Sequence, residues 1–247
     1  MLNSFLMHGW ASTPARLAIA AAVTLGFAVL ARALRGVNRS GALAGGLACF
    51  LLFAGAGPMA FATLAALFVM TWVSTRLGHH RKLALGLAER REGRNAWQIL
   101  ANLGVASLGS VVFGVTGIRV WLVAALAALA EAATDTVASE IGQYRGPHAL
   151  LITTWKRVPA GTDGGITIPG SITGLAAGLV IVAVAELGGM IPQRQLWIPV
   201  ACGFAGMLID SILGATLQRR GWISNQTVNF FATLAAAGLA YAIAMLA

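Results

Sequence analysis

The sequence predicts an all-α protein, a polytopic bundle of transmembrane helices. Of its 247 residues, 58% are hydrophobic and only 10% are charged, and the mean hydropathy is +0.79. A soluble domain of this length could not bury so much apolar surface in one core. Long apolar runs recur along the chain, each near the roughly 20 residues that a helix needs to cross the hydrocarbon layer.

We expect eight such helices, with seven as the alternative. In order, they cover residues 15–34, 41–57, 58–77, 96–116, 119–141, 168–188, 195–217 and 226–246. Only "GAGPM" separates the second run from the third, so a re-entrant hairpin there would lower the count. Arg16 and the run after it resemble a signal peptide, but membrane sequence resumes directly after "ARALRG", so we expect no cleavage. No repeat or soluble region is evident, so residues 1–247 are treated as one membrane domain.

The basic residues predict the orientation. With eight spans, all of the 17 Lys and Arg residues except Arg16, Arg119 and Arg194 fall on one side of the membrane. The positive-inside rule makes that side cytoplasmic and puts both termini outside. The net charge of +9 therefore indicates membrane topology and not nucleic-acid binding. The residues that we expect to contact anionic membrane lipids are Arg32, Arg35, Arg219 and Arg220.

Amide side chains mark the start of the fourth helix. Asn95, Gln98 and Asn102 fall at i, i+3 and i+7, which places them on one helical face, and Arg91 and Arg94 precede them. Hydrogen bonding between helices is the alternative for each residue, but the stripe as a whole favours a lined cavity.

Three carboxylates lie within "LAALAEAATDTVASEIGQY", residues 126–144. Asp135 shares a helical face with Ser139, whereas Asp135 and Glu140 diverge by about 140°. The two converge on one ion only if the helix ends or unwinds near Ser139, which the following Gly142 favours. Carboxylates are costly in a membrane, so they indicate a metal or a salt bridge to a basic residue. For Glu131 both alternatives stay open.

The loop "TTWKRVPAGTDGGITIPGS" combines cations with a glycine turn. Lys156 and Arg157 supply positive charge, and the turn at residues 161–165 could direct backbone N–H groups at an anion. Its spacing is not that of a Walker A loop, and a plain turn is the alternative.

The last two helices add one carboxylate and further amides. Asp210 lies on a stripe with Gly203, Gly206, Gly214 and Gln218, and a buried carboxylate requires a cation. At the start of the final helix, Ser224 or Asn225 is expected to cap, while Asn229 is the site candidate.

These residue types suit phosphoryl transfer. Asp135, Glu140 and Asp210 provide the hard oxygen ligands that Mg²⁺ prefers, and the cations and the glycine turn provide phosphate binders. The glycine stripes of the second, sixth and seventh spans could admit a lipid chain. A substrate with a phosphate head and a long apolar tail would match both halves.

Six segments, "SGALAGG", "GRNAWQILAN", "TDTVASEIG", "ITTWKRVPAGTDGG", "IDSILGATLQ" and "SNQTVN", resemble the integral membrane family known as domain of unknown function 92, which contains plant phytyl phosphate kinase and human transmembrane protein 19. The resemblance extends from Ser40 to the end of the chain. It departs from the family pattern at Leu103, where glycine is expected, and at Pro169, just after the glycine turn. The residues it carries over are Asn95, Gln98, Asn102, Asp135, Glu140, Gly161, Thr162, Gly164, Gly165, Asp210, Gln218 and Asn229.

The resemblance implies a kinase of isoprenoid salvage that converts a prenyl monophosphate, such as phytyl or geranylgeranyl phosphate, to the diphosphate with a nucleoside triphosphate, for which CTP is the expected donor. We assign Asp135, Glu140, Asp210 and Lys156 to catalysis, the first three as Mg²⁺ ligands. The residues assigned to substrate and nucleotide binding are Arg94, Asn95, Gln98, Asn102, Ser139, Arg157, Gly161, Thr162, Asp163, Gly164, Gly165, Ser211, Gln218 and Asn229. The alternatives are a nucleotidyl- or phosphotransferase that makes CDP-linked lipids, and a lipid or ion transporter or flippase.

Overall fold

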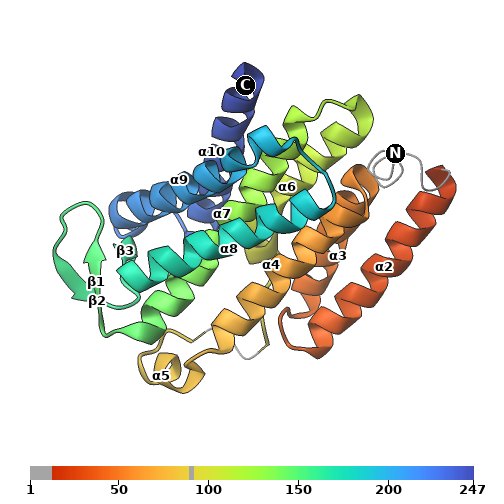
Figure 1. Ribbon diagram of the computed structural model, residues 1–247. Helices are drawn as coiled ribbons and strands as arrows, with labels where there is room; N and C mark the ends of the chain where they lie inside the picture. Colours follow the sequence, from red (N-terminus) through yellow and green to blue (C-terminus); the bar gives the residue numbers. More distant parts are fainter. Residues whose placement is uncertain (1–12, 89–91) are drawn as a thin grey trace.

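The computed structural model of the protein describes residues 13–88 and 92–247. The fold is all-α, as predicted, and the described residues contain eight helices that are long and apolar enough to cross a membrane (Figure 1). These helices are α2 (Thr13–Ala33), α3 (Arg39–Ala56), α4 (Pro58–Arg76), α6 (Ala96–Thr116), α7 (Val120–Arg145), α8 (Ile168–Leu187), α9 (Trp197–Leu213) and α10 (Asn225–Leu246). A short helix, α5 (His79–Ala84), joins α4 to α6, and a 3-10 turn (Gln193–Gln195) precedes α9.

The count is eight because α3 and α4 are separate full-length helices. Gly57 stands between them with φ 83° and ψ −174°, and its N–H donates to the Phe53 carbonyl at the end of α3 (2.8 Å). Pro58 then begins α4, where its missing N–H leaves no hydrogen bond unmade. With 18 and 19 residues, both helices reach spanning length, so the re-entrant hairpin is not formed.

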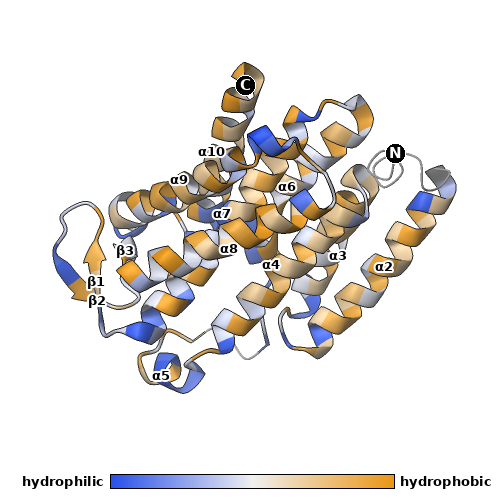
Figure 2. Cartoon of the chain, in the orientation of Figure 1, coloured by the Kyte–Doolittle hydropathy of each residue, from blue (hydrophilic) through white to orange (hydrophobic). Residues whose placement is uncertain are grey.

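The helix α7 occupies the centre of the bundle. In its most hydrophobic stretch 83% of the residues are buried, about twice the share of any other span, and it packs against α4, α6, α8, α9 and α10 (Figure 1). Most outward-facing residues of the other helices are hydrophobic, and hydrophilic segments gather at the ends of the bundle, notably around α5 and the strands (Figure 2). This distribution suits a helix bundle surrounded by lipid.

Glycines let α8 and α9 approach α7 closely. A Cβ atom added to Gly174 would lie 2.6 Å from the Thr134 carbonyl oxygen, and one added to Gly203 would lie 2.9 Å from the Glu131 nitrogen. Small residues at such positions allow backbones to pack directly against each other in a membrane. The glycine stripes of the sixth and seventh spans are therefore filled by α7, which corrects the expectation that they admit a lipid chain.

A small sheet, absent from the sequence prediction, lies between α7 and α8. Its strands β1 (His148–Leu151), β2 (Arg157–Pro159) and β3 (Gly165–Ile166) are antiparallel in the order β2-β1-β3. Leu150 pairs with Arg157 on one side and with Ile166 on the other. This pairing fixes the turn at residues 161–165 against the end of the bundle.

Gly174→Leu is expected to destabilise the fold by about 1–3 kcal/mol or more, because the added side chain would push α8 away from α7. Thermal unfolding of the purified protein in detergent measures this change. Gly238→Leu on α10 is the matched control, since a Cβ added at Gly238 meets no atom within 4 Å. Equal losses in the two variants would contradict the proposed close contact.

Candidate functional site

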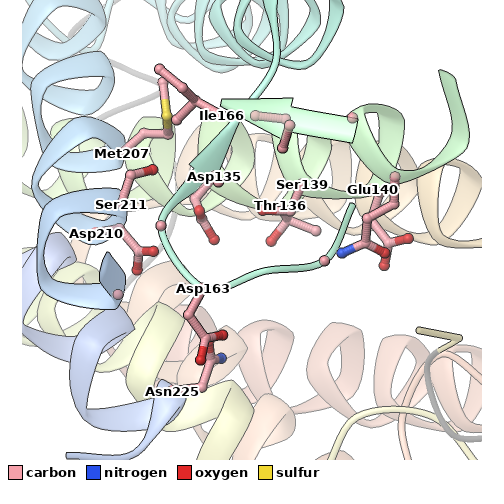
Figure 3. A pocket seen from close by; sticks show the side chains of 18 of the residues that line it. Asp135, Thr136, Ser139, Glu140, Asp163, Ile166, Met207, Asp210, Ser211 and Asn225 are labelled. Carbon is pink, nitrogen blue, oxygen red and sulfur yellow. The ribbon is translucent and has the colours of Figure 1, made fainter. Parts of the chain in front are cut away.

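A polar cavity of about 280 Å³ opens at the end of the bundle that holds the sheet and α5. Its wall combines the start of α6, the end of α7, the start of α8, the end of α9, the start of α10 and the turn that leads into β3. The cavity therefore brings together side chains that lie more than a hundred residues apart in the sequence (Figure 3).

Three aspartates from different elements line this cavity. Asp135 comes from α7, Asp210 from α9 and Asp163 from the turn at residues 161–165 (Figure 3). Asp210 is close enough to interact electrostatically with both Asp135 and Asp163. The structure thus brings the two helical carboxylates that the sequence singled out, Asp135 and Asp210, to one place.

Glu131 lies one turn deeper on α7 and is only 1% exposed. Its carboxylate interacts electrostatically with Asp135 and Asp210, and its Oε1 atom has no hydrogen-bond partner within the part of the chain that the structure describes. An orphaned buried carboxylate oxygen next to two further acids is costly. The acidic cluster therefore contains one buried oxygen that no group of the described chain satisfies.

Glu140 does not join this cluster. The helix α7 continues without a break to Arg145, so the divergence of about 140° between Asp135 and Glu140 is kept and the expected unwinding near Ser139 does not occur. The Glu140 carboxylate accepts a hydrogen bond from Thr75 Oγ1 (3.0 Å) and forms an ion pair with Lys82. The predicted ion site of Asp135, Glu140 and Asp210 is corrected accordingly, and no three His, Cys, Asp or Glu side chains among the described residues form a metal-binding group.

Lys82 has a structural role that the sequence analysis did not predict, where it counts only among the basic residues of one side of the membrane. It is 1% exposed, and its Nζ donates to the carbonyls of Ser74 (3.0 Å) and Thr75 (2.8 Å) besides pairing with Glu140. These carbonyls belong to the last turn of α4, where a cation is favourable. The pair ties α5 and α4 to α7 beside the cavity.

The amides divide between capping and the cavity. Asn95 and Gln98 form a capping box at the start of α6, with Asn95 Oδ1 accepting from the Gln98 N–H (3.1 Å) and Gln98 Oε1 from the Asn95 N–H (2.9 Å). Gln98 and Asn102 line the cavity, whereas Asn95 does not. Ser224 caps α10, as one of the two predicted alternatives, by accepting from the Thr227 N–H (3.2 Å).

Asn229 links the amides to Asp210. In the amide orientation that satisfies both of its polar atoms, Asn229 donates to Asp210 Oδ2 (3.3 Å) and to the Asn225 carbonyl (2.9 Å), and accepts from Asn102 Nδ2 (3.3 Å). Asn102 Nδ2 also donates to the Gln98 carbonyl (2.7 Å). This chain of hydrogen bonds connects α6, α9 and α10 along one wall of the cavity.

The turn at residues 161–165 packs directly on the end of α9. There the helix widens into a π-helical turn, Gly214–Gln218, a feature that often occurs at functional sites and that the sequence did not reveal. Gly164 has φ +75°, and a Cβ added to it would collide with Ala215 and with the Ser211 carbonyl. Gln218 Nε2 donates to Asp163 Oδ1 (2.9 Å) and so holds the turn in place.

Pro169, a departure from the family pattern, lies in the first turn of α8. Thr167 caps the helix by accepting from the Gly170 N–H (3.1 Å). Proline is well tolerated at this position because the first helical N–H groups have no partner within the helix. Pro169 is therefore compatible with the start of α8.

The predicted cations lie in different places. Arg94 lines the cavity, interacts electrostatically with Asp135 and reaches Thr136 Oγ1 (3.5 Å). Lys156 and Arg157 are exposed and lie outside the cavity wall, because the β1–β2 hairpin directs them away from it. Arg91 lies outside the described residues. The predicted residues that do line the cavity are Arg94, Gln98, Asn102, Asp135, Ser139, Glu140, Gly161, Thr162, Asp163, Gly164, Gly165, Asp210, Ser211, Gln218 and Asn229.

Comparison of the sequence with known proteins identifies a family. The model of the family described as integral membrane protein DUF92 matches residues 22–237. The chain is 31% identical to the uncharacterized membrane protein sll0875 of Synechocystis sp., over 78% of this chain and 77% of that protein. It is 30% identical to the uncharacterized membrane protein MJ0933 of Methanocaldococcus jannaschii, over 89% and 90% of the two chains.

A plant protein is also similar. The chain is 30% identical to Protein VTE6, chloroplastic, of Arabidopsis thaliana over 207 residues, which cover 78% of this chain and 61% of the plant protein. No solved structure matches the chain.

Lys82→Met is expected to destabilise the fold by about 1–3 kcal/mol, because it removes the cation that pairs with the partly buried Glu140 carboxylate and that donates to the end of α4. Unfolding of the purified protein by denaturant in detergent micelles measures the loss. The double variant Lys82→Met with Glu140→Leu should recover much of the stability, since no lone charge remains buried. A double variant as unstable as the sum of the single variants would argue against the ion pair.

Asp163 provides a pH test. Burial raises the pKa of its carboxyl above the ordinary value, and Arg219 opposes this to a smaller extent. A raised pKa means that the folded state binds more protons than the unfolded chain, so ionised Asp163 lowers stability as the pH rises above about 4. Asp163→Asn keeps an acceptor for Gln218 and should unfold at a higher temperature than the parent at pH 7. This difference should shrink toward pH 4, and a difference that is constant with pH would contradict the raised pKa.

Proposed function

This chain belongs to the integral membrane family DUF92, and we propose that it is a kinase that phosphorylates a prenyl monophosphate with a nucleoside triphosphate. The family resemblance implies this reaction, with phytyl or geranylgeranyl phosphate as the acceptor and CTP as the donor. The observation that carries the proposal is the cavity that Asp135 and Asp210 share with Arg94 and several side-chain amides.

The ligand chemistry of the cavity supports a divalent cation. Asp135 and Asp210 are the residues that would hold Mg²⁺, which proteins usually bind through one or two carboxylates together with waters and substrate phosphates. The unpartnered Glu131 oxygen beside these two acids supports a need for positive charge at this place. When bound, Mg²⁺ neutralises charge on the nucleotide phosphates.

The remaining groups of the cavity suit phosphate binding. Arg94 is the candidate for holding the acceptor phosphate, because a guanidinium binds phosphate through two parallel N–H bonds. Asn102 and Asn229 use their amide N–H groups within the hydrogen-bond chain that ends on Asp210, so they orient this carboxylate beside the phosphate site. The turn at residues 161–165 adds backbone N–H groups that no side chain of its three glycines covers. Lys156 and Arg157 are left out of this assignment because they are exposed.

In the proposed step an oxygen of the acceptor phosphate attacks the γ-phosphorus of the nucleotide. The bond from that phosphorus to the β,γ-bridging oxygen breaks, and the nucleoside diphosphate leaves with the electron pair. The acceptor is already anionic near neutral pH, so the step needs no strong general base. Positioning and charge neutralisation are sufficient, which suits a cavity with carboxylates, a guanidinium and amides but no nucleophile–base pair.

In the proposed orientation this cavity opens toward the cytoplasm. The cavity opens at the end of the bundle that also carries Arg35, Arg76, Arg145 and Arg219, and the positive-inside rule assigns this end to the cytoplasm with both termini outside. Nucleoside triphosphates are then available at the mouth of the cavity.

Asp135→Asn and Asp210→Asn are each expected to lower kcat/KM by roughly 100-fold or more, because each removes a carboxylate that would hold the metal. The assay supplies phytyl or geranylgeranyl monophosphate, Mg²⁺ and one of four nucleotides to the purified protein, and quantifies prenyl diphosphate and the released nucleotide product. Glu186→Gln, an exposed carboxylate near the other end of α8, is the matched control and should keep parental activity.

The released product separates the alternatives. Formation of a nucleoside diphosphate supports a kinase, whereas release of pyrophosphate would replace it with a nucleotidyltransferase. A third outcome is that no nucleotide is consumed with any prenyl phosphate, while Asp135→Asn still abolishes function in cells. The kinase hypothesis is then rejected and the transporter hypothesis is favoured.

A further inference from the structure

A second cavity of about 430 Å³ lies between α2, α3, α4 and α6. Its wall is mainly apolar and includes Phe27, Leu64, Leu67, Phe68 and Leu103. Its volume falls in the range of about 300–1,000 Å³ that is usual for small-molecule sites. The helix α2, which stands at the edge of the bundle and is mostly unburied, is the layer between this cavity and the surrounding lipid (Figure 1).

The apolar cavity adjoins the polar one at two shared residues. Arg94 and Asn102 line both cavities. Arg94 is held at the junction by its backbone, because its N–H donates to the Gly36 carbonyl (3.1 Å) and its carbonyl accepts from the Asn38 N–H (3.0 Å). An amphiphile that fills the apolar cavity can therefore present its polar end to Arg94 and to the acidic cavity beyond it.

Two glycines of α3, Gly45 and Gly46, differ from those of α8 and α9 because a Cβ atom added there would make no contact closer than 3.7 Å. A Cβ added to Gly45 would meet only Ile99 Cγ2, at 3.9 Å, whereas the glycines of α8 and α9 are filled by the backbone and side chains of α7. Both Gly45 and Gly46 line the apolar cavity. Of the three glycine stripes in which the sequence suggested a lipid chain, the stripe on α3 keeps a groove.

The charges at the mouth favour an anionic head group. Arg35, Arg76 and Arg94 line the apolar cavity at its polar end, and the residues described as lining it include no Asp or Glu. Arg76 is fixed there by stacking on Trp72, 4.0 Å from the ring centroid, and by donating to the Leu34 carbonyl (2.6 Å). A long apolar chain with a phosphate at one end matches this combination of apolar wall and cationic mouth.

We infer that the cavity between α2, α3, α4 and α6 holds the isoprenoid chain of the acceptor, with its phosphate at the Arg94 junction. The inference rests on the proposed kinase function for the identity of the chain. The stripe on α3 then selects acceptors by chain length, because only a long chain extends past Gly45 along the groove.

Gly45→Leu tests this chain site by filling the groove. For a C20 and a C5 prenyl monophosphate, the ratio of the two kcat/KM values should fall about tenfold or more, since the new side chain displaces buried methylene groups of the long chain. Gly238→Leu on α10 is the matched control and should keep the parental ratio. An unchanged ratio in Gly45→Leu would overturn the inference.

Photolabelling of the unaltered protein tests the site without turnover. A prenyl monophosphate with a diazirine at the end of its chain, added without nucleotide, should label peptides from the four helices of this cavity, residues 13–33, 39–56, 58–76 or 96–116. Excess unlabelled geranylgeranyl phosphate should reduce the labelling, and a zwitterionic phospholipid at the same concentration should not. Labelling confined to α8, α9 or α10, or equal competition by the phospholipid, would contradict the inference.

These experiments distinguish failure of the chain site from failure of the proposed kinase function. Labelling of α2, α3, α4 or α6 without phosphoryl transfer would keep the chain site and reject the kinase. Phosphoryl transfer with labelling confined to α8, α9 or α10 would keep the kinase and reject the chain site.

Discussion

Burying carboxylates within a membrane bundle is the constraint on which this structure depends. Charges are costly away from water, so each acid at this end of the bundle must find a cation or a hydrogen-bond donor. Glu140 pairs with Lys82, Asp163 accepts from Gln218, and Asp210 is linked to Asn229. Glu131 keeps one fully buried oxygen without a hydrogen-bond partner within the described chain, and this oxygen supports the proposal of a cation at this place.

Close backbone packing makes this concentration of polar groups possible. Glycines on α8 and α9 bring these helices against α7, so that Asp135 and Asp210 share one cavity, and Gly164 brings the turn onto the π-helical end of α9. Gly45 and Gly46 of α3 have no such close partner, and an apolar cavity remains beside them. Glycine therefore allows close helix packing at one interface and leaves room for a cavity at another. Arg94 lies where the polar and apolar cavities meet.

Much of the fold and part of the site follow from local sequence. The eight helices follow from hydropathy, because a span needs about 20 apolar residues whatever its neighbours are. Asp135, Asp210, Asn102 and Asn229 could be singled out for a similar reason, since polar groups inside apolar runs are expensive and require a purpose. The spacing of three residues between Asn95 and Gln98 also predicts a capping box, which the structure shows. The family resemblance assigns both residues to ligand binding instead.

The sequence by itself determined which segments cross the membrane and which polar residues lie within or beside them, because both depend on the chemistry of neighbouring residues along the chain. Only the tertiary structure decided the partners. It pairs Glu140 with Lys82 because α7 stays helical to Arg145. It keeps Lys156 and Arg157 out of the polar cavity because their hairpin is part of the small sheet. It also decided which glycine stripes are filled. Such choices depend on distances between elements far apart in the chain, which no local pattern contains.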